Sequence, residues 1–233
     1  MTQPRLLACY FDGGLGRAEM YRDLAVVLER TARKECPAWD IRVERIEPPE
    51  YVSAMGNPSH VWNTQKLEWW RDQVRAAADG DRLLLIDGDT AILKPLDSIW
   101  ERSFDLAFTF RETGLPLNGG VVFVRVSPQS RLFVERWWQI NIRLLGNAVA
   151  HTPWRAKYAG MNQAALGCLL ETVEHGCEIV RLPCREWNSC SPDMYDPRVA
   201  RILHVKSSLR RAVFGFEKPR TNMPHVIDAW RAL

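Results

Sequence analysis

One apolar run that ends in two acids constrains the fold of this chain more than any other segment. Residues 82–86 read Arg-Leu-Leu-Leu-Ile, and Asp87, Gly88 and Asp89 follow directly. An unbroken apolar run of this length is typical of a strand buried on both faces of a parallel sheet. The strand would carry Asp87 and Asp89 to its carboxyl end, where open α/β sheets bind their ligands.

The spacing of the two acids indicates a site for a hard cation. Because Gly88 places no side chain between them, Asp87 and Asp89 can approach the same divalent ion. Phosphate oxygens of a substrate would then fill the remaining positions around that ion. An Asp-x-Asp pair is weak evidence by itself, so its meaning depends on the rest of the chain.

The remaining segments alternate between strand and helix patterns, which predicts an α/β domain with a mostly parallel central sheet flanked by helices. We expect strands at residues 6–11, 40–46, 82–86, 104–110, 121–124, 178–182 and 199–205. We expect helices at residues 20–31, 97–100, 127–145 and 161–173. A further helix is expected to begin after an N-cap at Asn63 or Thr64 and to end at Ala77. Loops are expected at residues 53–60, 146–159 and 185–188. We place the domain at residues 1–211, with residues 212–233 as a C-terminal extension of little regular pattern packed on or beside it.

Composition excludes several classes of protein. The chain has 233 residues, 46% of them hydrophobic, and can bury a sizeable core. Its formal net charge of +3 is too small to indicate a nucleic acid partner. The six cysteines form no C-x-x-C pair and are most simply buried free thiols. No segment is long enough for a signal peptide core or a membrane span, so we expect a cytoplasmic protein, with peripheral membrane contact through residues 213–220 left open.

Candidate ligand contacts come from three further segments. Asp12 ends the first predicted strand before a glycine-containing loop, which either lines a nucleotide site or forms an ordinary tight turn. The loop lacks the dinucleotide-binding fingerprint, because Glu19 stands where its third glycine would be. Lys66 is either a phosphate or sugar contact or a solvated side chain. Asn118 precedes two glycines at a strand start, where it can hydrogen-bond a hydroxyl.

A late strand ends in His204, and Lys206 follows it. An imidazole together with Asp87 and Asp89 would hold a divalent ion, and Lys206 would offset the charge of a bound phosphate. A buried packing histidine is an equally common role for such a residue. The conjunction of the acids, the Asn118 segment and His204 is stronger evidence than any one of them.

Five segments together carry a resemblance to a known family. They are 84–90 (Leu-Leu-Ile-Asp-Gly-Asp-Thr), 117–123 (Leu-Asn-Gly-Gly-Val-Val-Phe), 161–163 (Met-Asn-Gln), 187–188 (Trp-Asn) and 202–206 (Ile-Leu-His-Val-Lys). This series resembles that of GT-A nucleotide-sugar glycosyltransferases. Within that group it looks most like the retaining family-eight-like enzymes, which include glycogenin and bacterial lipopolysaccharide galactosyl- and glucosyltransferases. The resemblance covers roughly residues 6–206, and its most specific block is the Asp-x-Asp segment.

The resemblance implies a metal-dependent transfer of sugar from a nucleotide-diphosphate donor, expected to be a UDP-sugar, to a glycan or other hydroxyl acceptor, with Mn²⁺ or Mg²⁺ as cofactor. It implies Asp87, Asp89 and His204 as metal ligands and Gln163 with Asn162 near the reacting sugar carbon. The other implied donor contacts are Asp12, Lys66, Asn118, Gly119, Trp187, Asn188 and Lys206.

The chain departs from the family pattern at two places. Asn162 replaces the acid of the family's Asp-Gln pair, which leaves the stereochemical course open. After His204, Ser207 to Arg211 replace the family's glycine and Lys-Pro-Trp ending, so Lys206 and an arginine are the candidate phosphate ligands. Both departures bear on the expected mechanism more than on the expected fold.

Two rival functions remain open at the level of sequence. Asp-x-Asp after an apolar strand also begins the active site of haloacid-dehalogenase-type phosphatases and phosphotransferases. That pattern requires Thr or Val where Ala91 stands, and a later pair of acids beyond the isolated Asp193, Asp196 and Asp228. In the other rival, a non-catalytic binding domain, the acids are a solvated strand end.

Overall fold

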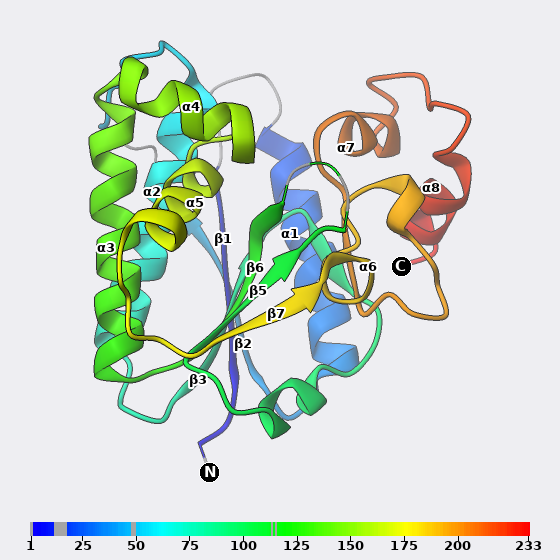
Figure 1. Ribbon diagram of the computed structural model, residues 1–233. Coiled ribbons are helices and arrows are strands. Elements are labelled where there is room, and N and C mark those ends of the chain that lie inside the picture. Colours follow the sequence, from blue (N-terminus) through cyan, green and yellow to red (C-terminus); the bar gives the residue numbers. More distant parts are fainter. Residues whose placement is uncertain (1, 12–17, 48–49, 113, 115) are drawn as a thin grey trace.

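A six-stranded sheet forms the centre of the computed structural model, which describes residues 2–11, 18–47, 50–112, 114 and 116–233. The strand order is β2-β1-β3-β6-β5-β7 (Figure 1). The strands are β1 (Arg5–Phe11), β2 (Asp40–Ile46), β3 (Arg82–Asp87), β5 (Leu106–Phe110), β6 (Leu117–Arg125) and β7 (Ile179–Pro183). β6 runs antiparallel to both of its neighbours, whereas the other adjacent pairs are parallel. The mostly parallel sheet predicted from the sequence is therefore confirmed.

The apolar run of β3 is buried on both faces, as its sequence predicts. Leu83 and Leu85 enter the core on one side of the sheet, and Leu84 and Ile86 enter the core on the other side. All four side chains are fully buried. Successive strand residues point to opposite faces, so a strand covered on both sides needs apolar residues at every position.

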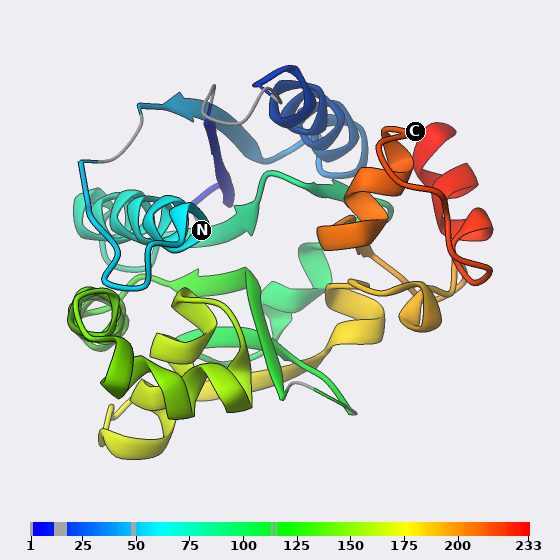
Figure 2. The ribbon, with the colours of Figure 1, turned by 90° about the horizontal axis from the view of Figure 1, so that it is seen from above.

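Helices cover the two faces unequally (Figure 2). On one side lie the four helices α2 (Pro58–Ala76), α3 (Pro128–Leu145), α4 (Ala148–Tyr158) and α5 (Asn162–Thr172). On the other side lie α1 (Ala18–Glu35) and the short 3₁₀ helix η1 (Asp97–Glu101). A helix layer on each face is what closes both cores of the sheet.

A two-stranded antiparallel sheet, β4 (Thr90–Ile92) with β8 (Ile202–His204), lies beyond the carboxyl end of β3. A third core joins it to α1, α7 (Ser207–Val213) and α8 (Pro224–Arg231). This core includes Met20, Leu24, Val226 and Trp230. The C-terminal segment therefore packs on the rest of the chain through apolar contacts. Its helices α7 and α8 lie to the right of the central sheet in Figure 1.

Several element boundaries differ from the sequence-based expectations. α2 begins at Pro58, capped by Asn57, whose Oδ1 accepts a hydrogen bond from Ser59 N, so the expected N-cap at Asn63 or Thr64 is wrong. Residues 148–158 form α4 instead of a loop, and residues 184–187 form the short α6 (Cys184–Trp187). The tail contains α8, and η2 (Pro192–Met194) precedes β8. The predicted Ser127-Pro128 start of α3 is confirmed, with a complete capping box.

All six cysteines are free thiols, and all but Cys177 are buried, in agreement with the prediction. Across the described residues, no helix combines the length and apolarity that crossing a membrane requires.

Candidate functional site

Strand pairing brings Asp87, Asp89 and His204 together. β3 ends at Asp87, and Asp89 directly precedes β4. Thr90 pairs with His204 across the β4–β8 ladder, and Val205 N donates to Asp89 O at 2.9 Å. One ligand atom from each of the three side chains lies within 4.8 Å of the others. The late histidine thus reaches the acids because β8 adds to the strand that follows them.

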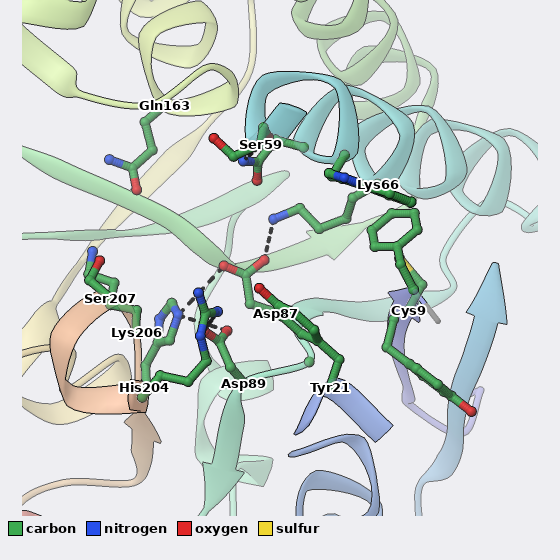
Figure 3. A pocket seen from close by; sticks show the side chains of 16 residues that line it. Cys9, Tyr21, Ser59, Lys66, Asp87, Asp89, Gln163, His204, Lys206 and Ser207 are labelled. Atoms are coloured by element: carbon green, nitrogen blue, oxygen red, sulfur yellow. Dashed lines mark hydrogen bonds and ion pairs between the residues drawn. The ribbon is translucent and has the colours of Figure 1, made fainter. Parts of the chain in front are cut away.

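Each carboxylate has one oxygen turned toward His204 and one turned toward a cation (Figure 3). His204 Nε2 lies 3.1 Å from Asp89 Oδ1 and 3.7 Å from Asp87 Oδ2, which we call the inner oxygens. The outer oxygens are Asp87 Oδ1, which accepts from Lys66 Nζ, and Asp89 Oδ2, which lies 2.8 Å from an Arg210 guanidinium nitrogen. The three potential metal-binding atoms therefore face one another.

A buried hydrogen-bond relay holds the His204 ring from behind. His204 Nδ1 lies 2.9 Å from Asn188 Oδ1, Asn188 Nδ2 donates to Thr109 Oγ1 at 2.8 Å, and Thr109 Oγ1 donates to Asn118 O at 2.8 Å. Because Asn188 presents a carbonyl oxygen, Nδ1 must carry the proton. Nε2 is then the ring nitrogen that faces the carboxylates, and it is the atom of this ring that would bind a metal ion.

Gly120 leaves the space in which these side chains meet. A Cβ at this position would lie 2.5 Å from Asp87 Oδ2, 2.7 Å from His204 Cε1 and 3.0 Å from Asn118 Oδ1. Gly120 N donates to Asn118 Oδ1 at 2.9 Å. The antiparallel direction of β6 explains this placement, because its first residues lie beside the last residues of β3. The glycine is required here for close approach rather than for an unusual backbone conformation.

The electrostatic surroundings keep Asp89 ionised. Burial by itself would raise the pKa of Asp89, but the His204 ring and the Arg210 guanidinium outweigh it and hold that pKa well below its usual range. Burial lowers the pKa of the nearby Lys206 ammonium. Two carboxylates and an imidazole nitrogen are a donor set that a divalent metal ion accepts, with positions left for other oxygens.

The three metal-ligand candidates form one side of a cavity of about 360 Å³ (Figure 3). Its charged lining residues are Asp87, Asp89, Lys66, Lys206 and Arg210. Its aromatic and neutral polar lining is Tyr10, Phe11, Tyr21, Ser59, Trp62, Asn63, Gln163 and Ser207. The volume suits a small-molecule ligand, and three cations beside two carboxylates favour an anionic one.

Six of the residues predicted as site residues line this cavity: Lys66, Asp87, Asp89, Gln163, His204 and Lys206. Asn118 and Gly119 are buried; Asn118 Oδ1 accepts from Gly120 N, and its Nδ2 has no hydrogen-bond partner among the residues that the structure describes. Asp12 lies outside the described residues.

The remaining predicted residues lie away from the cavity. Trp187 packs edge-on against Phe123, and Asn188 is fully buried in the relay behind His204. The structure gives these two residues packing and positioning contacts, and the donor contacts expected of them stay predictions. Asn162 is buried, and its backbone oxygen accepts from Trp137 Nε1 at 2.8 Å.

The sequence analysis found only Lys66 among the α2 residues that line the cavity. It expected an arginine near the phosphate but did not identify Arg210. Ser59, Trp62, Asn63 and Lys66 line the cavity at helical spacing. That pattern was detectable, because residues three and four apart share a helix face. The placement of Arg210 depends on α7, whose first residue, Ser207, has a positive φ of 53°.

Known structures with this architecture decide the fold. A glycosyltransferase involved in the glycosylation of the major capsid of PBCV-1 superposes with a TM-score of 0.64, 14% identity and full coverage of both chains. The chain has the GT-A fold. The galactosyltransferase LgtC, in complex with donor and acceptor sugar analogs, gives 0.54 at 12% identity over 99% of this chain and 94% of that one. GlyE of Streptococcus pneumoniae TIGR4 gives 0.56 at 11% identity over 100% of this chain and 61% of its own. The sequence matches no protein-family model and no curated protein.

Proposed function

We propose that this GT-A chain is a metal-dependent glycosyltransferase that moves a sugar from a nucleotide-diphosphate donor, with UDP-sugars as first candidates, to a hydroxyl of a glycan or similar acceptor. The observation that carries the proposal is the convergence of Asp87, Asp89 and His204 with three cations in one cavity of this fold. Two carboxylates and an imidazole suit a divalent ion, and the cations suit the diphosphate of the donor.

Asp87 Oδ2, Asp89 Oδ1 and His204 Nε2 would hold Mn²⁺ or Mg²⁺, and the Gly120 cradle leaves these atoms free to face one another. When bound, the ion supplies positive charge against the negative charge that develops on the leaving diphosphate. Lys206 and Arg210 line the same cavity and add fixed positive charge for that leaving group. Together they favour breaking the bond between the sugar and the diphosphate.

Gln163 reaches the cavity from the α5 side (Figure 3). Its Nε2 donates to Tyr158 O at 2.8 Å, so its carbonyl oxygen is the end that a substrate can meet. A carboxamide oxygen can stabilise positive charge at the reacting sugar carbon, although it cannot act as a general base at neutral pH. In this proposal Asn162 supports Gln163 through the backbone of the first helical turn, and the buried Asn118 Nδ2 is the candidate donor to a sugar hydroxyl.

The rival functions receive less support from the geometry. Asp87 and Asp89 are the carboxylates among the described residues that line the cavity. Asp193 lies elsewhere and accepts a hydrogen bond from Asn222, and Asp196 forms ion pairs with Arg185 and Arg198. A phosphatase that needs a further pair of acids is therefore disfavoured. Asp89 is only 8% exposed, which disfavours a solvated strand end.

The test is hydrolysis or transfer from a panel of nucleotide sugars with Mn²⁺, Mg²⁺ or a chelator. A thermal-shift screen of the same donors selects the nucleotide, because a bound ligand stabilises the folded state by mass action. We expect metal-dependent turnover that falls at least about 100-fold in Asp89→Asn, since lost charge stabilisation of this kind costs a few kcal/mol of barrier.

The matched control for this test is Asp193→Asn, an acid outside the cavity. It should keep wild-type turnover. Equal turnover by Asp89→Asn and the wild type, or turnover that ignores chelation, would contradict the metal assignment. Release of phosphate from simple phosphomonoesters without any sugar transfer would favour the phosphatase instead.

A further inference from the structure

Two thiols, Cys184 and Cys190, lie in contact with each other in the segment that carries Asn188. Cys184 begins α6, and Cys190 follows Asn188 by two residues. The Cys184 thiol donates a hydrogen bond to Cys190 Sγ, and Arg111 Nη2 donates to the same sulfur at 3.1 Å. Cys184 is 2% exposed and Cys190 is 4% exposed. A disulfide bond, in which the sulfurs lie about 2.05 Å apart, therefore needs only a further approach of two sulfurs that already meet.

The surroundings of Cys190 favour its thiolate. The hydrogen bond from Cys184 lowers the pKa of Cys190, the positive charges of Lys206 and Arg111 lower it further, and together they outweigh the opposite effect of burial. At the half-buried Cys177, burial instead raises the pKa of the thiol to about 11. Because the thiolate is the reactive form, we expect Cys190 to react with an oxidant before Cys177, although Cys177 is the more exposed of the two.

Hydrogen peroxide is an oxidant small enough for this position. Arg185, next to Cys184, is exposed, and Ser191, next to Cys190, is half-buried, so the thiols lie close to the surface. The Cys190 thiolate attacks one peroxide oxygen, the O–O bond breaks, and the leaving hydroxide takes up a proton to give water. Cys184 then loses its proton and bonds to Cys190 Sγ, and the sulfenic hydroxyl leaves with that proton as a second water. Two electrons pass from the two thiols to the peroxide.

The disulfide would close a short loop, residues 184–190, that contains Asn188. Asn188 N donates to Cys184 O at 2.9 Å, and Asn188 Oδ1 lies 2.9 Å from His204 Nδ1. Ser189 is held to β8 by two backbone hydrogen bonds of 2.9 Å. Because β8 holds Ser189, the approach of Cys184 to Cys190 has to move the α6 side of the loop. Asn188 is bonded to that side, so its side chain would shift relative to the His204 ring.

We propose that Cys184 and Cys190 form a redox-active dithiol, and that its oxidation to a disulfide displaces Asn188 from His204 and weakens the binding of a divalent metal ion. The effect on the metal rests on the proposed function, whereas the formation of the disulfide does not depend on it. Reduction of the disulfide would return the ring to the position in which Nε2 faces the carboxylates. The same site would therefore be active in the reduced protein and weakened in the oxidised one.

The first experiment maps the thiols. The folded protein is treated with hydrogen peroxide, the remaining thiols are alkylated, and the unreduced peptides are identified by mass spectrometry. We expect a disulfide between Cys184 and Cys190, with Cys177 alkylated. Cys184→Ser should stop at a sulfenic acid on Cys190, which dimedone captures. Cys177→Ser is the matched control, because it removes the more exposed thiol, and it should form the disulfide as the wild type does.

The second experiment measures Mn²⁺ affinity by calorimetry in the reduced and the oxidised wild type. We expect oxidation to weaken binding about 10-fold or more, since partners that hold a metal-binding histidine typically change affinity about 10–100-fold. A phosphine reductant should restore the affinity. Asn188→Leu already lacks the contact to His204, so oxidation should change its affinity much less. Cys184→Ser should keep its affinity after peroxide treatment, and melting temperatures show that every sample is folded.

Peroxide that modifies Cys177 and leaves Cys184 and Cys190 as free thiols would overturn the inference. A mapped disulfide with unchanged Mn²⁺ affinity would overturn it as well, and so would an equal loss of affinity in Asn188→Leu and the wild type. Sugar transfer by a protein that forms no disulfide would leave the proposed function standing. A disulfide that weakens Mn²⁺ binding in a protein that turns over no nucleotide sugar would count against the proposed function alone.

Discussion

Two walls of the cavity are built in different ways. The strand wall consists of Asp87, Asp89 and His204, which are placed by the β3, β4 and β8 backbones and by the relay through Asn188. The helix wall consists of Ser59, Trp62, Asn63 and Lys66 of α2 and Gln163 of α5. The strand wall fixes its side chains by ladder pairing and buried hydrogen bonds, whereas the helix wall depends on how helices pack and join.

The junction between α4 and α5 shows how differently the helix wall is supported. Ala159 has φ 56° and ψ 167°, a region that is almost confined to glycine, and Gly160 follows with φ 62°. Gln163 bonds back across this junction to Tyr158 O, and His151 Nε2 lies 3.0 Å from Gly160 O. The metal-ligand candidates are thus held by paired strands, whereas Gln163 depends on the backbone conformation of the junction before α5.

The largest expected effect comes from filling the cradle on the strand wall. Gly120→Ala would put a methyl group 2.5 Å from Asp87 Oδ2 and 2.7 Å from His204 Cε1. Because both contacts are side-chain atoms, the fold can yield while the three ligand atoms separate, so we expect Mn²⁺ affinity to fall on the order of 100-fold. Calorimetry and melting temperature measure the two effects separately.

Gly146→Ala is the control for this change, because the nearest atom to its added Cβ lies 3.8 Å away. It should keep both metal affinity and melting temperature. Wild-type metal binding by Gly120→Ala would show that the three side chains do not act together.

The second prediction compares two buried asparagines, Asn188 behind the strand wall and Asn141 behind α2 of the helix wall. Asn188→Leu removes the acceptor that fixes the His204 tautomer, and partners of this kind typically change metal affinity about 10–100-fold. Asn141 is also fully buried and donates to Thr64 Oγ1 at 2.7 Å between α3 and α2, and it has no hydrogen bond to His204 or to its relay. Asn141→Leu should cost similar stability, about 1–3 kcal/mol, without changing metal affinity. Equal metal affinities of the two variants would remove Asn188 from its positioning role.

The helix wall should respond to acid in a way that depends on His60. Burial lowers the pKa of His60, with further lowering by His151 and Arg155, so the folded state binds the proton less readily than the unfolded chain. The unfolded state then takes up the proton first as pH falls below about 6.5, and the folded state loses relative stability in that range. We expect melting temperatures between pH 7.5 and pH 5.5 to fall more steeply in the wild type than in His60→Gln. Parallel curves would contradict this account of α2 and α4.

The smallest expected effect lies at the junction of α4 and α5. Ala159→Gly removes the steric cost of a conformation that suits glycine, and we expect a gain of about 1 kcal/mol, or roughly 2–4 °C in melting temperature. Gly160→Ala, at φ 62°, should lose a similar amount. Metal affinity should be unchanged in both, because neither residue touches the strand wall. A lower melting temperature for Ala159→Gly would show that this junction is not strained.

The sequence predicted elements well where local pattern and burial agree. The apolar run of β3 alternates between two cores, and Ser127-Pro128 begins α3 with a complete cap. The helices α4 and α8 were not predicted from the sequence. In α4 only His151 and Tyr158 are buried, so the helix carries little apolar periodicity. In α8 the buried residues Val226, Ile227 and Trp230 follow helical spacing, but the helix is short and lies among prolines.

The sequence by itself determined the double-sided burial of β3, the delivery of Asp87 and Asp89 to its end, and the residue types that suit a metal ion. Only the tertiary structure decided that β6 runs antiparallel, that β8 pairs with β4, and that Arg210 reaches Asp89. The reason is physical. Side-chain chemistry and strand periodicity are local properties of the chain, whereas pairing between distant segments depends on how both cores close around the sheet.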